Sequence, residues 1–93
     1  MSKQEKIQHS EKEISDTLNK ENKFLILYND DYHTFDYVID ALIDICKHEE
    51  EQAVQCTYLV HYKGKADVKK GSYGFLKPMM TQLRKRDLKA AIE

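Results

Sequence analysis

Apolar and polar positions divide the chain into a polar start and a periodic remainder. Lys, Glu, Gln, Ser and Asn dominate residues 1–22, where the apolar side chains available for burial are few: Ile7, Ile14 and Leu18. So few apolar side chains cannot offset the entropy that is lost when such a segment becomes ordered. We therefore predict a mobile polar tail over residues 1–22 and one folded domain over residues 23–93.

The first part of the periodic region predicts a strand, a polar turn and a helix. Residues 23–28 form a short apolar and aromatic run, KFLILY, which is typical of a buried strand. Residues 29–31 (NDD) end this run, because Asn and Asp favour turns and helix N-termini. Apolar side chains then recur at helical spacing over residues 35–46, and Thr34 is the expected N-cap.

The second part predicts two further helices and two further strands. A helix over about 49–64 ends at Gly64 in a left-handed cap, and its inner face carries Ala53, Cys56, Thr57 and Val60. Residues 65–70 alternate as in a half-exposed strand, and a third helix begins near Gly74 or bends at Pro78. A short strand near the C-terminus completes the order strand, helix, helix, strand, helix, strand. This order predicts an α+β fold, with a small three-stranded antiparallel sheet and three helices packed on one face.

Charge and hydropathy exclude two classes of partner. The 15 basic and 16 acidic residues give a formal net charge of −1, whereas a nucleic-acid-binding protein usually carries a basic excess. No apolar stretch approaches the roughly 20 residues that cross a bilayer, and the first residues lack the apolar segment of a secretory signal. We therefore predict a cytoplasmic protein that binds neither nucleic acid nor membrane, with Cys46 and Cys56 as buried thiols.

The turn residues Asn29, Asp30 and Asp31 are the first candidates for chemistry. An amide and two carboxylates between a strand end and a helix start create a negative, partly exposed mouth. Such a mouth suits an ammonium group, which is a cation that also donates hydrogen bonds. The same side chains could equally serve only to cap and turn the chain. The residues alone leave both interpretations open.

His61, on the second predicted helix, is the other candidate. It could be a hydrogen-bonded boundary residue or an acceptor for the N–H group of a ligand. His33, His61, Asp30 and Asp31 could in principle surround zinc, but they are scattered and form no recognisable ligand spacing. No Ser, His and Asp arrangement and no glycine-rich phosphate loop stands out. We therefore predict no enzyme activity, no cofactor and no metal site.

Three segments together resemble the ClpS adaptor family. They are residues 28–32 (YNDDY), 38–40 (VID) and 60–66 (VHYKGKA), and the similarity covers residues 22–93. ClpS proteins are adaptors of bacterial ATP-dependent proteolysis. They bind proteins whose first residue is bulky and apolar, which is the N-degron of the N-end rule, and deliver them to a Clp-family AAA+ unfoldase. The resemblance thus implies a bacterial cytoplasmic adaptor whose partners are N-degron proteins and the N-terminal domain of an unfoldase.

The resemblance also implies roles for individual residues. Asn29, Asp30 and His61 match the positions that hold the α-amino group, and Asp31 matches the second acidic residue of the turn. The positions of the side-chain pocket are matched by His33, Thr34, Phe35, Val38, Thr57, Val60 and Leu88. Many members carry Thr-Pro in place of His33 and Thr34, and Met in place of Phe35 and Thr57. The preference among Leu, Phe, Tyr and Trp is therefore not predicted.

Two alternatives compete with the adaptor hypothesis. The first is a metal-dependent hydrolase that uses Asp30, Asp31 and His61. The second is an interaction domain with the same scaffold but no pocket for a chain terminus, as in ribosomal stalk proteins with a related fold. Under the second alternative the turn of Asn29, Asp30 and Asp31 would have no purpose beyond capping.

Overall fold

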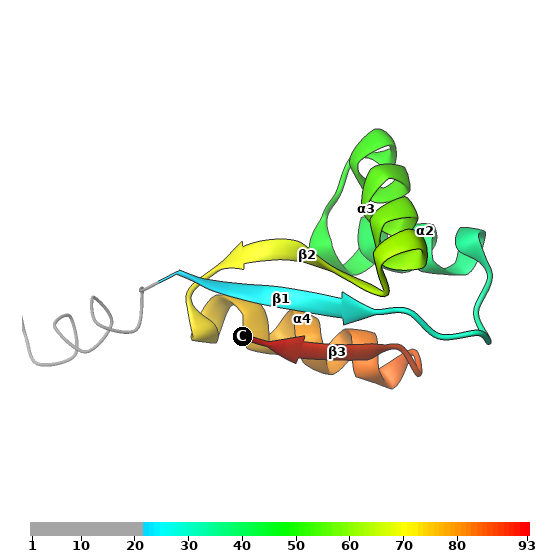
Figure 1. Cartoon of the computed structure of the whole chain (residues 1–93). Coiled ribbons are helices and arrows are strands. Elements are labelled where there is room, and N and C mark those ends of the chain that lie inside the picture. The colour runs from blue at the N-terminus through cyan, green and yellow to red at the C-terminus, as the bar shows by residue number, and fades with distance from the viewer. Residues whose placement is uncertain (1–21) are drawn as a thin grey trace, which may run out of the picture.

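The computed structural model describes residues 22–93, which form three strands and three helices (Figure 1). In chain order these are β1 (Lys23–Tyr28), α2 (Phe35–Cys46), α3 (Glu50–Lys63), β2 (Lys65–Gly71), α4 (Tyr73–Lys85) and β3 (Lys89–Ile92). This order and the antiparallel pairing of all three strands confirm the predicted fold. The predicted mobile tail lies outside the described residues, apart from Asn22.

Strand β1 lies at the centre of the sheet, whose strand order is β2-β1-β3. Its residues Leu25 and Leu27 are fully buried, because one face of the sheet packs against the helices. The helices contribute to the same core the side chains of Ala41, Leu42, Cys46, Ala53, Val60, Leu76, Met80 and Leu83. Figure 1 shows α4 running along the sheet, with α2 and α3 standing as a pair beside β2.

The ladder between β1 and β2 contains an irregularity, and a buried histidine bonds the carbonyl group that it leaves unpaired. The register shifts between Leu25 and Ile26, and Val68 on β2 is left without a partner. The carbonyl oxygen of Val68 instead lies 2.6 Å from Nε2 of His48, a side chain that is only 4% exposed. Because a carbonyl only accepts, Nε2 carries the proton, and Nδ1 of His48 is buried without a partner among the described residues.

The ends of α2 and α3 test the predicted caps. The side chain of Thr34 accepts a hydrogen bond from the Tyr37 backbone N–H at 3.1 Å, which confirms the predicted N-cap. Gly64 adopts the predicted left-handed conformation with φ of 87°. The end of α2 differs, because Lys47 is itself a left-handed cap with φ of 61°.

Helix α4 begins one residue earlier than expected. Ser72 is its N-cap and accepts a hydrogen bond from the Phe75 backbone N–H at 3.1 Å, so the helix starts at Tyr73. Pro78 is therefore inside the helix rather than in its first turn. Its ring removes one backbone hydrogen bond and crowds the carbonyl of Gly74, at a cost that neighbouring packing must offset.

Candidate functional site

A backbone hydrogen bond joins the two segments that the sequence marks as candidates. The N–H of Asn29 donates to the carbonyl oxygen of Gly64 at 2.9 Å, which fastens the end of β1 to the C-terminal cap of α3. His61 lies in the last turn of α3. The acidic turn and His61, which are distant in sequence, therefore lie at the rim of the same cavity.

The cavity at this junction has a volume of about 380 Å³. It is lined by Leu27, Tyr28, Asn29, Asp30, Asp31, His33, Thr34, Phe35, Val38, Thr57, Val60, His61 and Leu88. Every site residue that the sequence analysis proposes is in this set. Leu27 and Tyr28 of β1 were not proposed, because a central strand signals burial in the core rather than the wall of a pocket.

Buried apolar side chains form the closed part of the cavity. Leu27 is fully buried, and Val60 and Leu88 are 4% and 3% exposed. Thr57 is also buried, and its hydroxyl donates to the Ala53 carbonyl oxygen at 2.7 Å within α3. Because this bond already satisfies the hydroxyl, Thr57 offers no free donor to a ligand. This part of the cavity therefore suits an apolar side chain.

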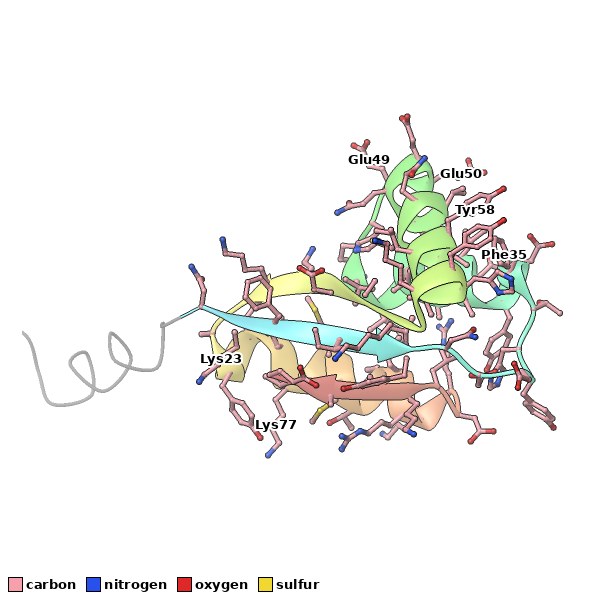
Figure 2. All side chains as sticks on the ribbon, viewed as in Figure 1. Lys23, Phe35, Glu49, Glu50, Tyr58 and Lys77 are labelled. Atoms are coloured by element: carbon pink, nitrogen blue, oxygen red, sulfur yellow. The ribbon has the colours of Figure 1, made fainter. Side chains whose placement is uncertain are left out.

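Phe35 stands at the boundary between the apolar part and the rim. Figure 2 shows its ring beside that of Tyr58, and the two meet edge to face with centroids 5.3 Å apart. The ring of His61 meets Phe35 in a similar way, also at 5.3 Å. Tyr62 stacks on Tyr58 with centroids 5.5 Å apart, so the row of contacting aromatic rings continues along α3. These contacts hold the Phe35 ring more rigidly than the flexible side chain of a methionine could be held.

The carboxylate of Asp30 makes hydrogen bonds within the turn. One carboxylate oxygen accepts hydrogen bonds from the backbone N–H groups of Tyr32 and His33, both at 2.8 Å. The other lies 3.0 Å from Nδ1 of His33. Partial burial acts to raise the pKa of Asp30, but the bonds from His33 and Tyr32 outweigh it and lower the pKa. Asp30 is therefore ionised at neutral pH, and its side chain caps the turn.

Asn29, Asp31 and His61 remain available to a ligand. All three are exposed, and within residues 22–93 their side chains make no hydrogen bond. The cavity lining includes Asp30 and Asp31 but neither lysine nor arginine. The rim therefore combines free acceptors with negative charge, as an ammonium group requires.

Other chemistries find little support in the described residues. Residues 22–93 contain no group of three His, Cys, Asp or Glu side chains that could hold a metal ion, so the zinc site considered above is not supported. Cys46 and Cys56 are free thiols, and burial raises the pKa of Cys46 to about 11 and also raises that of Cys56. Both thiols are therefore poor nucleophiles at neutral pH. No helix in this part of the chain is long and apolar enough to span a bilayer.

Comparison with known proteins identifies the family. The family model described as ATP-dependent Clp protease adaptor protein ClpS matches residues 19–91. This chain belongs to the ClpS family. Proteins of the ClpS family are named as adaptors and not as enzymes, which agrees with the sequence analysis and does not favour the metal-dependent hydrolase.

Relatives of known name support this assignment. The ATP-dependent Clp protease adapter protein ClpS of Shewanella pealeana is 38% identical over 66 residues, which are 70% of this chain and 65% of the relative. The ClpS of Escherichia coli O1:K1 / APEC is 38% identical over 60 residues, 63% of this chain and 57% of that protein. The chain thus spans less than two thirds of the length of these relatives.

A solved structure shows the same fold. Agrobacterium tumefaciens ClpS2, determined with bound L-phenylalaninamide, superimposes with a TM-score of 0.66. The match covers 81% of this chain and 96% of ClpS2, at 19% sequence identity. Since the two sequences share so few residues, the similarity establishes the ClpS fold of this chain and not its ligand.

Proposed function

We propose that this chain is an adaptor that binds proteins through a free, bulky and apolar N-terminal residue. One observation carries the proposal: a single cavity joins a negatively charged rim with free acceptors to a closed apolar part. A free N-terminal residue has the same two parts, an ammonium group and a side chain on one carbon atom. L-phenylalaninamide, the molecule bound to Agrobacterium ClpS2, also combines a free amine with an aromatic side chain.

The two halves of the cavity would contribute comparable free energies. Full burial of a Leu or Phe side chain is worth about 1.5–3 kcal/mol, and each charge-assisted hydrogen bond about the same before costs. Ordering the peptide offsets part of this gain. A dissociation constant on the order of micromolar is the expected result. Neither half alone would give useful affinity.

We assign the ammonium group to Asn29, Asp31 and His61. The amide oxygen of Asn29, the carboxylate of Asp31 and a ring nitrogen of His61 can each accept one of its hydrogen bonds. Asp30, which the family resemblance places among the direct contacts, acts here mainly by holding the turn and by its charge. Val38, Thr34 and Phe35 then border the first side chain on the α2 side of the cavity.

The apolar half is tested by varying only the first residue of a peptide. Peptides beginning with Leu, Phe, Tyr or Trp are expected to bind about 10- to 100-fold more tightly than those beginning with Gly or Arg, because only the former bury a large apolar side chain. Fluorescence anisotropy with labelled peptides and the full chain measures the difference. Equal affinity across the set would refute the side-chain pocket and favour an interaction domain without one.

We also propose that the adaptor hands its cargo to a Clp-family AAA+ unfoldase in the bacterial cytoplasm. The family name supports a partnership with Clp protease components. The N-terminal domain of the unfoldase is the proposed docking partner, and residues 1–22 are the proposed segment that acts in delivery. Among the described residues, those that line the cavity fall between Leu27 and Leu88, so we expect peptide binding to persist without residues 1–22.

Removing residues 1–22 should therefore separate binding from delivery. The truncated protein is expected to bind a Phe-starting peptide with unchanged affinity but to slow degradation of a Phe-starting substrate by a Clp unfoldase and its protease. Anisotropy measures the first property, and loss of a fluorescent substrate over time measures the second. Degradation at the full rate by the truncated adaptor would contradict the role of this segment while leaving the pocket intact.

A further inference from the structure

His33 occupies an environment that its position in the acidic turn does not explain. One face of its ring stacks on Tyr37, with centroids 4.6 Å apart and an interplanar angle of 18°. Tyr32 meets the ring edge to face at 5.1 Å. The side chain is only 10% exposed, yet it lines the cavity. The contacts with its neighbours therefore fix the imidazole within the lining of the cavity.

The hydrogen bond to Asp30 determines which ring nitrogen carries the proton. The ionised carboxylate of Asp30 can only accept, so the contact of 3.0 Å requires a proton on Nδ1 of His33. In the neutral imidazole Nε2 is then an acceptor. Within residues 22–93 this nitrogen has no hydrogen-bond partner, and it is not among the buried unpartnered atoms. His33 thus presents an accessible acceptor at a fixed position.

The apolar side of the cavity offers few competing acceptors. Leu27, Val60 and Leu88 are apolar, and the hydroxyl of Thr57 donates its proton to a carbonyl within its own helix, which leaves only the lone pairs of its oxygen. Among the described lining residues, His33 has an acceptor whose ring is held in place by two neighbouring aromatic rings. A site that can bond a substrate hydroxyl discriminates against a substrate that lacks it.

We propose that His33 is a specificity-determining residue whose Nε2 accepts a hydrogen bond from the phenol O–H of an N-terminal tyrosine. The inference rests on the proposed function and refines it: the preferred substrates are proteins whose first residue is Tyr rather than Phe. The phenol is the donor and the imidazole the acceptor, and no covalent step is involved. The expected advantage of one such bond is about 3- to 10-fold in affinity.

Three peptides that differ only at the first residue test the proposal on the full chain. They begin with Tyr, Phe or para-methylphenylalanine, which matches the volume of Tyr but has no donor. The Tyr peptide is expected to bind about 3- to 10-fold more tightly than the para-methylphenylalanine peptide in anisotropy competition. The variant His33→Phe keeps an aromatic ring against Tyr37 and lacks the acceptor, so the affinity ratio between the Tyr and para-methylphenylalanine peptides should fall to about one, whatever the change in the affinity that the peptides share.

The outcomes separate the proposal from its competitors. If His33 served only to hold Asp30, His33→Phe would weaken all three peptides by the same factor, which would overturn a direct contact. If the variant does not fold, the wild-type comparison decides, because equal affinity for the Tyr and para-methylphenylalanine peptides overturns the proposal while the proposed function stands. Failure of all three peptides to bind the wild type would instead refute the proposed function, and with it this refinement.

Discussion

Acetylating the α-amine of a peptide that begins with Phe is expected to weaken its binding at least about a hundredfold. Acetylation removes the positive charge and all but one of the N–H donors. The acceptors of Asn29, Asp31 and His61 would then lose their partners, and each charge-assisted bond is worth about 1.5–3 kcal/mol. The Phe side chain is unchanged, so the loss reports on the rim alone. Anisotropy with free and acetylated forms of one labelled peptide measures it.

A substitution on the protein side identifies the carboxylate responsible. Asp31→Asn removes one charge from the rim without disturbing the bonds that Asp30 makes within the turn. It should weaken the free peptide about tenfold and leave the acetylated peptide unaffected. Asp36→Asn, which changes an exposed carboxylate outside the cavity lining, is the matched control and should change neither. Equal binding of free and acetylated peptides to the wild type would refute the proposal that the rim binds the α-amino group.

Local signals predicted the parts of the fold that depend on neighbouring residues. Thr34 at the start of α2 and Gly64 at the end of α3 each have a conformational preference that acts within one helical turn, and both adopt the expected role. Lys47 has no such preference, so its left-handed conformation could not be anticipated. The pairing of His48 with Val68 links two elements across the sheet edge, and no local pattern encodes it.

The sequence predicted which residues line the candidate site but not the role of each one. The family resemblance proposed the cavity-lining residues apart from Leu27 and Tyr28. It placed Asp30 among the residues that hold the α-amino group and Asp31 only as the second acidic residue of the turn. The geometry distinguishes them in another way, since the carboxylate of Asp30 bonds the backbone of the turn and that of Asp31 does not. The fixed orientation of His33 likewise depends on Tyr37, a contact one helical turn away that spacing alone did not reveal.

Replacing His48 with alanine should lower the free energy of unfolding by about 2–4 kcal/mol. The substitution leaves the carbonyl of Val68 without a donor at the bulge and opens a cavity where the imidazole packed. His48→Gln is the matched control, because its amide N–H can reach toward the same carbonyl, and it should retain much of the stability. Urea unfolding followed by circular dichroism measures both. A wild-type-like alanine variant would show that the bulge does not depend on this bond.

The same residue gives stability a pH dependence whose sign follows from its burial. Burial lowers the pKa of His48 in the folded state, and the bond to Val68 only partly opposes this shift. The unfolded chain therefore binds a proton first, so stability is fully present above about pH 6.5 and declines as the pH falls below it. His48→Gln cannot titrate and should flatten the decline, whereas His61→Gln, at an exposed position, should preserve it. If wild type and His48→Gln lost stability in parallel between neutral and mildly acidic pH, the proton would have to bind elsewhere, and the unpartnered Nδ1 of His48 would not be the group that limits stability in acid.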